Sequence, residues 1–111
     1  MAQYAILIYE DEAEWGKAAP EWIQHVAKEY GQFAQDNGRS LRGGSQLQPT
    51  MTAKAVRDGT VSDGPMVATT PALSGYYVIE APDLDAAAEI AKQVPSKFGG
   101  VEVRPLFAGQ G

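Results

Sequence analysis

Length and composition fit one globular domain with its own core, because the chain has 111 residues of which 44% are hydrophobic and 21% are charged. Nine basic and fourteen acidic side chains give a formal net charge of −5, which argues against a nucleic-acid-binding protein, since such proteins need a basic face. Cysteine is absent and histidine occurs once, so disulfides, thiolate catalysis and metal sites rich in Cys or His are excluded.

The first half of the chain predicts a strand, a long helix and a weaker strand. Residues Tyr4–Tyr9 are β-branched or aromatic and nearly all apolar, as in a buried strand. Residues Pro20–Asn37 place their apolar side chains on one helical stripe, with Pro20 suited to the first turn and Gly38 to the stop. Residues Leu41–Leu47 form a weak strand that two glycines interrupt, which suggests a bulge.

The second half predicts a hairpin, a strand, a helix and a final strand. Asp58-Gly59 favours a type I′ turn, because both central positions of that turn need positive φ. Asp83 suits the N-cap of the following helix, which Pro95 is expected to end. The expected ranges are Ala53–Arg57 and Thr60–Ser62 for the hairpin, then Gly75–Glu80, Leu84–Val94 and Val101–Leu106.

Without the hairpin, this order is βαββαβ, the ferredoxin-like arrangement of an α+β fold. Its first and third main strands are central, and these are the two most apolar strands here. Two helices cover only one face of such a sheet, yet the first strand is apolar on both faces. We therefore expect a second copy of the chain to cover the other face in a homodimer.

Three separated motifs, in register along essentially the whole chain, resemble the DGPF branch of the YCII-related family. They are Ser62-Asp63-Gly64-Pro65-Met66, the segment Leu73–Asp85, and the paired end strands Ile6–Tyr9 and Gly100–Pro105. The resemblance implies a single YCII-related (DGPF-type) domain over residues 1–111. It also implies a dimeric α+β barrel, in which two ferredoxin-like sheets face each other.

The chain departs from the family pattern directly after Asp-Gly-Pro. Met66 stands where the family usually has Phe, and the uncharged segment 68–72 replaces an acidic-Thr-Lys-Glu stretch. If those family Lys and Glu residues take part in chemistry, this chain lacks that chemistry. A His–Asp pair has been proposed for YCII itself, but His25 lies on the flank of the helical stripe and is interpreted as solvated.

Asp63 is the candidate catalytic residue, as a general base or ligand anchor beside a turn shaped by Gly64 and Pro65. The alternative is a plain turn whose Asp caps its own backbone. Arg104 alternates with valines, so it is expected to face the cavity between subunits and hold a carboxylate or phosphate, or else to form an ion pair with Glu102. Tyr76 or Tyr77 faces the same cavity, as ligand lining or as dimer core.

The remaining polar patterns predict no cofactor and no metal. Glycine-rich nucleotide loops are absent. Glu10, Asp11, Glu12 and Glu14 are adjacent rather than spaced as an ion loop, so a solvated acidic loop is expected. No apolar stretch reaches the ~18 residues of a membrane span, and the N-terminus lacks the pattern of a secretory signal, so we expect a cytoplasmic protein without membrane contact.

Two functions from different classes stay open. One is a small-molecule enzyme or binder with its site in the dimer cleft, where Asp63, Gly64, Pro65, Tyr76 and Arg104 would meet the ligand. The other is a non-catalytic interaction or accessory protein linked to an extracytoplasmic-function sigma factor, because some members of the family are encoded beside such factors. The missing charges after Asp-Gly-Pro favour the second function more for this chain than for the average member of the family.

Overall fold

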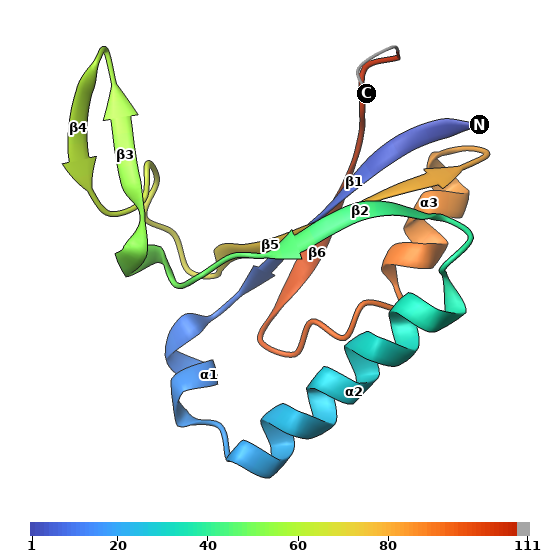
Figure 1. Ribbon diagram of the computed structural model, residues 1–111, viewed down its shortest axis with the longest axis horizontal. Helices are drawn as coiled ribbons and strands as arrows, with labels where there is room; N and C mark the ends of the chain where they lie inside the picture. Colours follow the sequence, from blue (N-terminus) through green and yellow to red (C-terminus); the bar gives the residue numbers. More distant parts are fainter. Residues whose placement is uncertain (109–111) are drawn as a thin grey trace.

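A computed structural model describes residues 1–108 as an antiparallel four-stranded sheet, with helices on one face and a separate hairpin (Figure 1). The strand order is β2-β5-β1-β6, so the two most apolar strands are central, as the sequence predicts. The elements are β1 (Ala2–Glu10), α1 (Glu12–Lys17), α2 (Pro20–Asp36), β2 (Leu41–Gln46), η1 (Thr50–Thr52), β3 (Lys54–Arg57), β4 (Thr60–Asp63), β5 (Ala72–Ala81), α3 (Leu84–Ala91) and β6 (Gly99–Pro105).

Local sequence explains where the helices begin and end. Pro20 opens α2, and the backbone N–H of Asn37 closes it on the Phe33 carbonyl. The Asp83 carboxylate caps α3 by accepting from the backbone N–H of Ala86 at 2.8 Å. Helix α3 ends at Ala91, earlier than predicted, and the chain reaches Pro95 through a turn.

The predicted acidic loop before α2 is wrong, because the segment forms the short helix α1. The Asp11 carboxylate caps it by accepting from the backbone N–H groups of Ala13 and Glu14. Glu12 and Glu14 lie in the first turn, where negative charge is favourable toward the helix dipole. Glu10 is not solvated at all: it ends β1 and is only 4% exposed.

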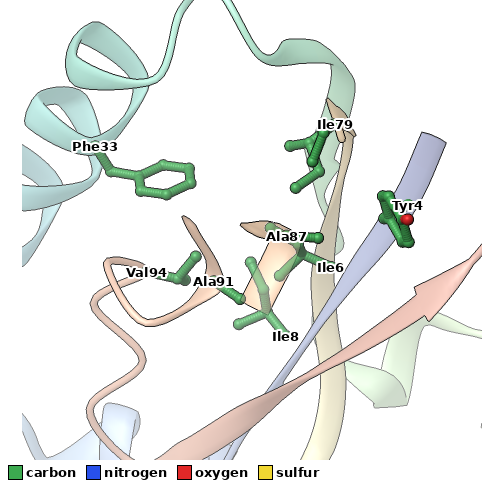
Figure 2. Close-up of a cluster of buried hydrophobic side chains, with 9 residues drawn as sticks. Tyr4, Ile6, Ile8, Phe33, Ile79, Ala87, Ala91 and Val94 are labelled. Atoms are coloured by element: carbon green, nitrogen blue, oxygen red, sulfur yellow. The ribbon is translucent and has the colours of Figure 1, made fainter. Parts of the chain in front are cut away.

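The core lies between the sheet and the helices, as Figure 2 shows. Alternate residues of β1 point into it and are buried. They meet Ile79 from β5, Phe33 from α2, and Ala87 and Ala91 from α3. Val101 and Val103 of β6 pack against the same cluster, so strict alternation directs Glu102 and Arg104 to the other face.

That outer face is also largely apolar. The strand register places Ala5 beside Val78, Leu7 beside Tyr76, and Tyr9 beside Leu73. The β1 residues of this set are half-buried, while Leu73 and Tyr76 are 39% and 38% exposed. The expectation of a strand that is apolar on both faces is therefore confirmed for the single chain.

Strands β3 and β4 form a hairpin that projects beyond the sheet, on the side away from α2 and α3 (Figure 1). Asp58 has φ +50° and Gly59 has φ +77°, as the predicted type I′ turn requires. The hairpin pairs with no strand of the main sheet within residues 1–108. The radius of gyration is 15.3 Å, above the ~13 Å of a compact chain of this length, which is consistent with a projecting arm.

None of the helices within residues 1–108 has the length and apolar character needed to cross a membrane.

Candidate functional site

A cleft of about 800 Å³ opens on the helical side of the sheet, between α1, α2 and the strands β2 and β5. Apolar and aromatic side chains make up most of its side-chain lining, with a few polar groups among them, which is the usual composition of a small-molecule site. The lining includes the side chains of Glu10, Glu12, Trp15, Ile23, Tyr30 and Tyr77.

Glu10 fixes the end of the cleft where β1 meets α1. Its carboxylate accepts hydrogen bonds from the Trp15 indole N–H at 2.9 Å and from the backbone N–H groups of Phe98 at 2.8 Å and Lys97 at 3.1 Å. A buried carboxylate is tolerated when donors of this kind satisfy it. One side chain thereby joins β1, α1 and the loop before β6.

Three aromatic rings pack around this anchor. The ring centroids of Trp15, Trp22 and Phe98 lie 5.2–5.4 Å apart in all three pairs, in tilted or edge-on arrangements that aromatic pairs prefer. The interpretation of both tryptophans as packing residues agrees with these contacts. The cluster holds α1 and the start of α2 against the loop before β6.

A second carboxylate ties α1 to η1, the short helix that follows β2. Glu12 accepts from the backbone N–H of Thr50 at 2.8 Å and from the Thr50 hydroxyl at 2.7 Å. Glu12 and Thr50 both lie near the surface, so the charge of Glu12 is located at the mouth of the cleft. The connection from β2 to η1 is thus held as a wall of the cleft.

Tyr30 and Tyr77 are among the neutral polar groups of the cleft. Burial, followed by the negative charge of Glu10, raises the pKa of Tyr30 above its usual value of about 10. Burial also raises the pKa of Tyr77, whose ring packs 5.0 Å from that of Phe33. Both phenols therefore stay protonated at neutral pH and are suited to donating a hydrogen bond rather than removing a proton.

Gly44 sets the position of Tyr77 beside β2. Its φ of +148° is one that other residues rarely adopt, and a Cβ there would lie 2.8 Å from the Tyr77 ring. Glycine therefore lets the ring lie against the backbone of β2. The predicted irregularity in this strand is confirmed by a register shift between Leu41 and Gly43.

The Asp-Gly-Pro motif lies at the base of the hairpin, outside this cleft. The Asp63 side chain is 87% exposed and forms an ion pair with Lys54, its partner across the hairpin. Gly64 has φ +97° and donates its backbone N–H to Ala53 at 2.8 Å, while Pro65 borders a hollow of about 360 Å³ on the hairpin. The structure thus keeps Asp63, Gly64 and Pro65 together but apart from the larger cleft.

Arg104 lies on the outer face of the sheet, where the alternation of β6 places it. Its guanidinium Nε donates to Glu102 at 2.9 Å, so the predicted ion pair is present. Tyr76 lies beside Leu7 on that face and also borders the large cleft, so it stands between the two regions. Arg104 and Asp63 are not brought together with the cleft.

The His25 side chain lies on α2 and is 70% exposed, and its Nε2 atom lies 3.8 Å from the Glu29 carboxylate. This placement agrees with the interpretation of His25 as a solvated helix residue.

Within residues 1–108, no three His, Cys, Asp or Glu side chains are grouped as metal ligands.

Comparison with known proteins gives the family. The model of the YCII-related domain matches residues 2–108. The chain belongs to the YCII-related domain family. It is also 31% identical over 113 aligned residues to an uncharacterized protein of Rhizobium meliloti (strain 1021), covering 93% of this chain and 90% of that relative. The family resemblance drawn from the motifs is thereby confirmed at the level of the YCII-related domain.

Sequence reasoning missed Glu10 and Tyr30 as members of a site. Glu10 continues the alternating series of buried residues Tyr4, Ile6 and Ile8, and this alternation is the signal that could have placed it in the interior. A buried carboxylate needs hydrogen-bond donors, so the same signal indicates a residue that anchors other segments rather than one in a solvated loop. The location of Tyr30 beside a cleft depends on how α2 packs, which its own helical stripe does not encode.

We expect Asp63→Asn and Asp63→Ala each to change the free energy of unfolding by less than about 1 kcal/mol, because an exposed ion pair contributes little. Urea unfolding measures this, with Lys54→Gln as the matched control that removes the other half of the pair. A loss above about 2 kcal/mol would contradict the exposed placement of Asp63. If Asp63 acts on a ligand, Asp63→Asn loses a ligand-induced rise in melting temperature that Lys54→Gln retains.

Proposed function

We propose that this protein binds a small organic molecule in the cleft between its helices and sheet, as a cytoplasmic homodimer of the DGPF branch of the family. The observation that carries the proposal is the cleft itself: about 800 Å³ with a mainly apolar and aromatic lining and a few polar groups. The hydrogen bonds of Glu10 and Glu12 support it, because they give the cleft fixed walls before any ligand arrives.

The polar groups of the cleft are better suited to binding than to turnover. The Glu10 and Glu12 carboxylates both already accept from protein donors, and the Ser74 hydroxyl donates to the Ile8 carbonyl at 3.2 Å. The two protonated tyrosines offer hydrogen-bond donors to a ligand. Asp63, Gly64, Pro65 and Arg104 stay proposed site residues on the hairpin and the outer face, and Tyr76 lies next to both regions.

A screen of small aromatic and aliphatic fragments by ligand-observed NMR tests the binding function. Ala27 lines the cleft and is exposed, so Ala27→Trp fills the cleft without entering the core. We expect fragments that bind the parent chain to lose at least about tenfold in affinity to this variant, because the bulky indole occupies their volume. The control is Gln24→Trp, on the same helix and outside the lining, which should keep full affinity. A screen in which no fragment distinguishes the two variants contradicts the proposal.

We propose that the homodimer forms through the outer face of the sheet, which a second copy of this chain covers. The cross-strand pairs of Ala5 with Val78 and Tyr9 with Leu73 make this face apolar along its centre. An antiparallel sheet whose outer face meets water carries polar residues there. Burial against a second copy would give the dimeric α+β barrel that the family resemblance implies.

Light scattering after size exclusion is expected to give about twice 11.9 kDa for the parent chain. Leu7→Arg places a charge in the centre of the outer face and should yield a monomer. Leu84→Arg is the control, because Leu84 is 46% exposed on α3 away from that face. A parent chain that is monomeric at micromolar concentration contradicts the interface.

The accessory function is the second candidate, and the hairpin favours it. Val56 and Val61 face each other across the hairpin and are 60% and 61% exposed, so the arm presents apolar surface to solvent. Such an arm suits contact with another protein. This alternative predicts that the fragment screen finds no ligand whose affinity depends on the cleft.

A further inference from the structure

We infer that the ligand of the cleft is an organic cation, a protonated amine carried on an aromatic or aliphatic body. The inference rests on the proposed binding function and specifies its ligand class. It stands on the charges that line the cleft, on where the nearby cations are held, and on the aromatic surface between them.

The charged side chains that line the cleft within residues 1–108 are all negative. Among the lining residues that the structure describes within 1–108, Glu10 and Glu12 carry formal charge and none is Lys, Arg or His. Carboxylates at the edge of a low-dielectric cavity focus a negative potential into it. An anionic ligand would meet repulsion there, whereas a cation would be attracted.

The negative charge of Glu10 is not cancelled by its own partners. The three hydrogen bonds that it accepts within residues 1–108 come from neutral donors, two backbone N–H groups and the Trp15 indole. The carboxylate is 4% exposed, so water screens its charge little within the cavity. The raised pKa of Tyr30, to which this charge contributes, is consistent with a field that reaches into the cleft.

The lysines next to the cleft, Lys17, Lys28 and Lys97, do not line it. Lys17 lies 3.4 Å from Glu14 on α1, and Lys97 lies 3.1 Å from Glu29 on α2. The acidic charge of the cleft is therefore left for a ligand to balance.

The rest of the lining suits the body of such a ligand. Trp15, Tyr30 and Tyr77 present aromatic rings, and Ile23 adds aliphatic surface. An ammonium group over an aromatic face gains a cation–π attraction, while its apolar body is removed from water. The carboxylates and the apolar side chains of the lining together favour a compact amine over a carboxylate or phosphate.

Three probes of matched shape test the inference: benzylamine, benzyl alcohol and benzoate. We expect binding to the parent chain, measured by NMR titration, to fall in that order, with benzylamine at least about tenfold tighter than benzyl alcohol. Glu12→Gln should weaken benzylamine about fivefold and leave benzyl alcohol unchanged, since the amide keeps the shape and the Thr50 contact. Glu14→Gln is the control: it removes the same charge from the same helix turn, outside the lining.

The results separate this inference from the proposed function. Tighter binding of benzoate or benzyl alcohol overturns the cationic class while the cleft remains a small-molecule site. Equal weakening of benzylamine by both glutamate variants overturns the role of the cleft charge. If none of the three probes binds, the inference fails, and the fragment screen with Ala27→Trp decides separately whether the cleft binds small molecules.

Discussion

At the end of β1, one buried carboxylate receives hydrogen bonds from Trp15 and from the backbone of Lys97 and Phe98. Burying a charge is costly, but hydrogen bonds to a charged group contribute about 1.5–3 kcal/mol each, so three of them offset much of that cost. Because the partners come from α1 and from the loop before β6, Glu10 determines where both segments lie. The aromatic cluster, the start of α2 and the mouth of the cleft depend on this arrangement.

The cleft exists because α2 serves two purposes along its length. Phe33, in its last turns, packs in the core with Ile79, while Ile23 in its early turns lines the cavity. The Glu12–Thr50 contact holds the connection after β2 at the opposite wall. The result is a cavity whose walls are fixed by polar contacts and whose surface is mainly apolar, a combination that favours a preformed binding site.

Periodicity and turn chemistry predicted most of the fold. The central strands, α2, the Asp58-Gly59 hairpin and the Asp83 cap follow from local residue patterns that tertiary packing did not override. Helix α1 was missed because its four acidic neighbours suggested solvent, whereas Asp11 is a cap and Glu10 is a buried anchor. The cleft was not predictable in this way, because it arises between α2 and the strands β2 and β5, and no local pattern encodes the distance between packed elements.

Hydrogen exchange followed by NMR tests the anchoring role of Glu10 most directly. The indole N–H of Trp15 donates to Glu10, whereas that of Trp22 has no acceptor within residues 1–108, so the two tryptophans form an internal comparison. We predict slow exchange for the Trp15 indole and the Phe98 amide, close to that of Ile6 in β1, and fast exchange for the Trp22 indole. Exchange of the Trp15 indole and the Phe98 amide at the rate of the Trp22 indole would contradict the anchoring role of Glu10.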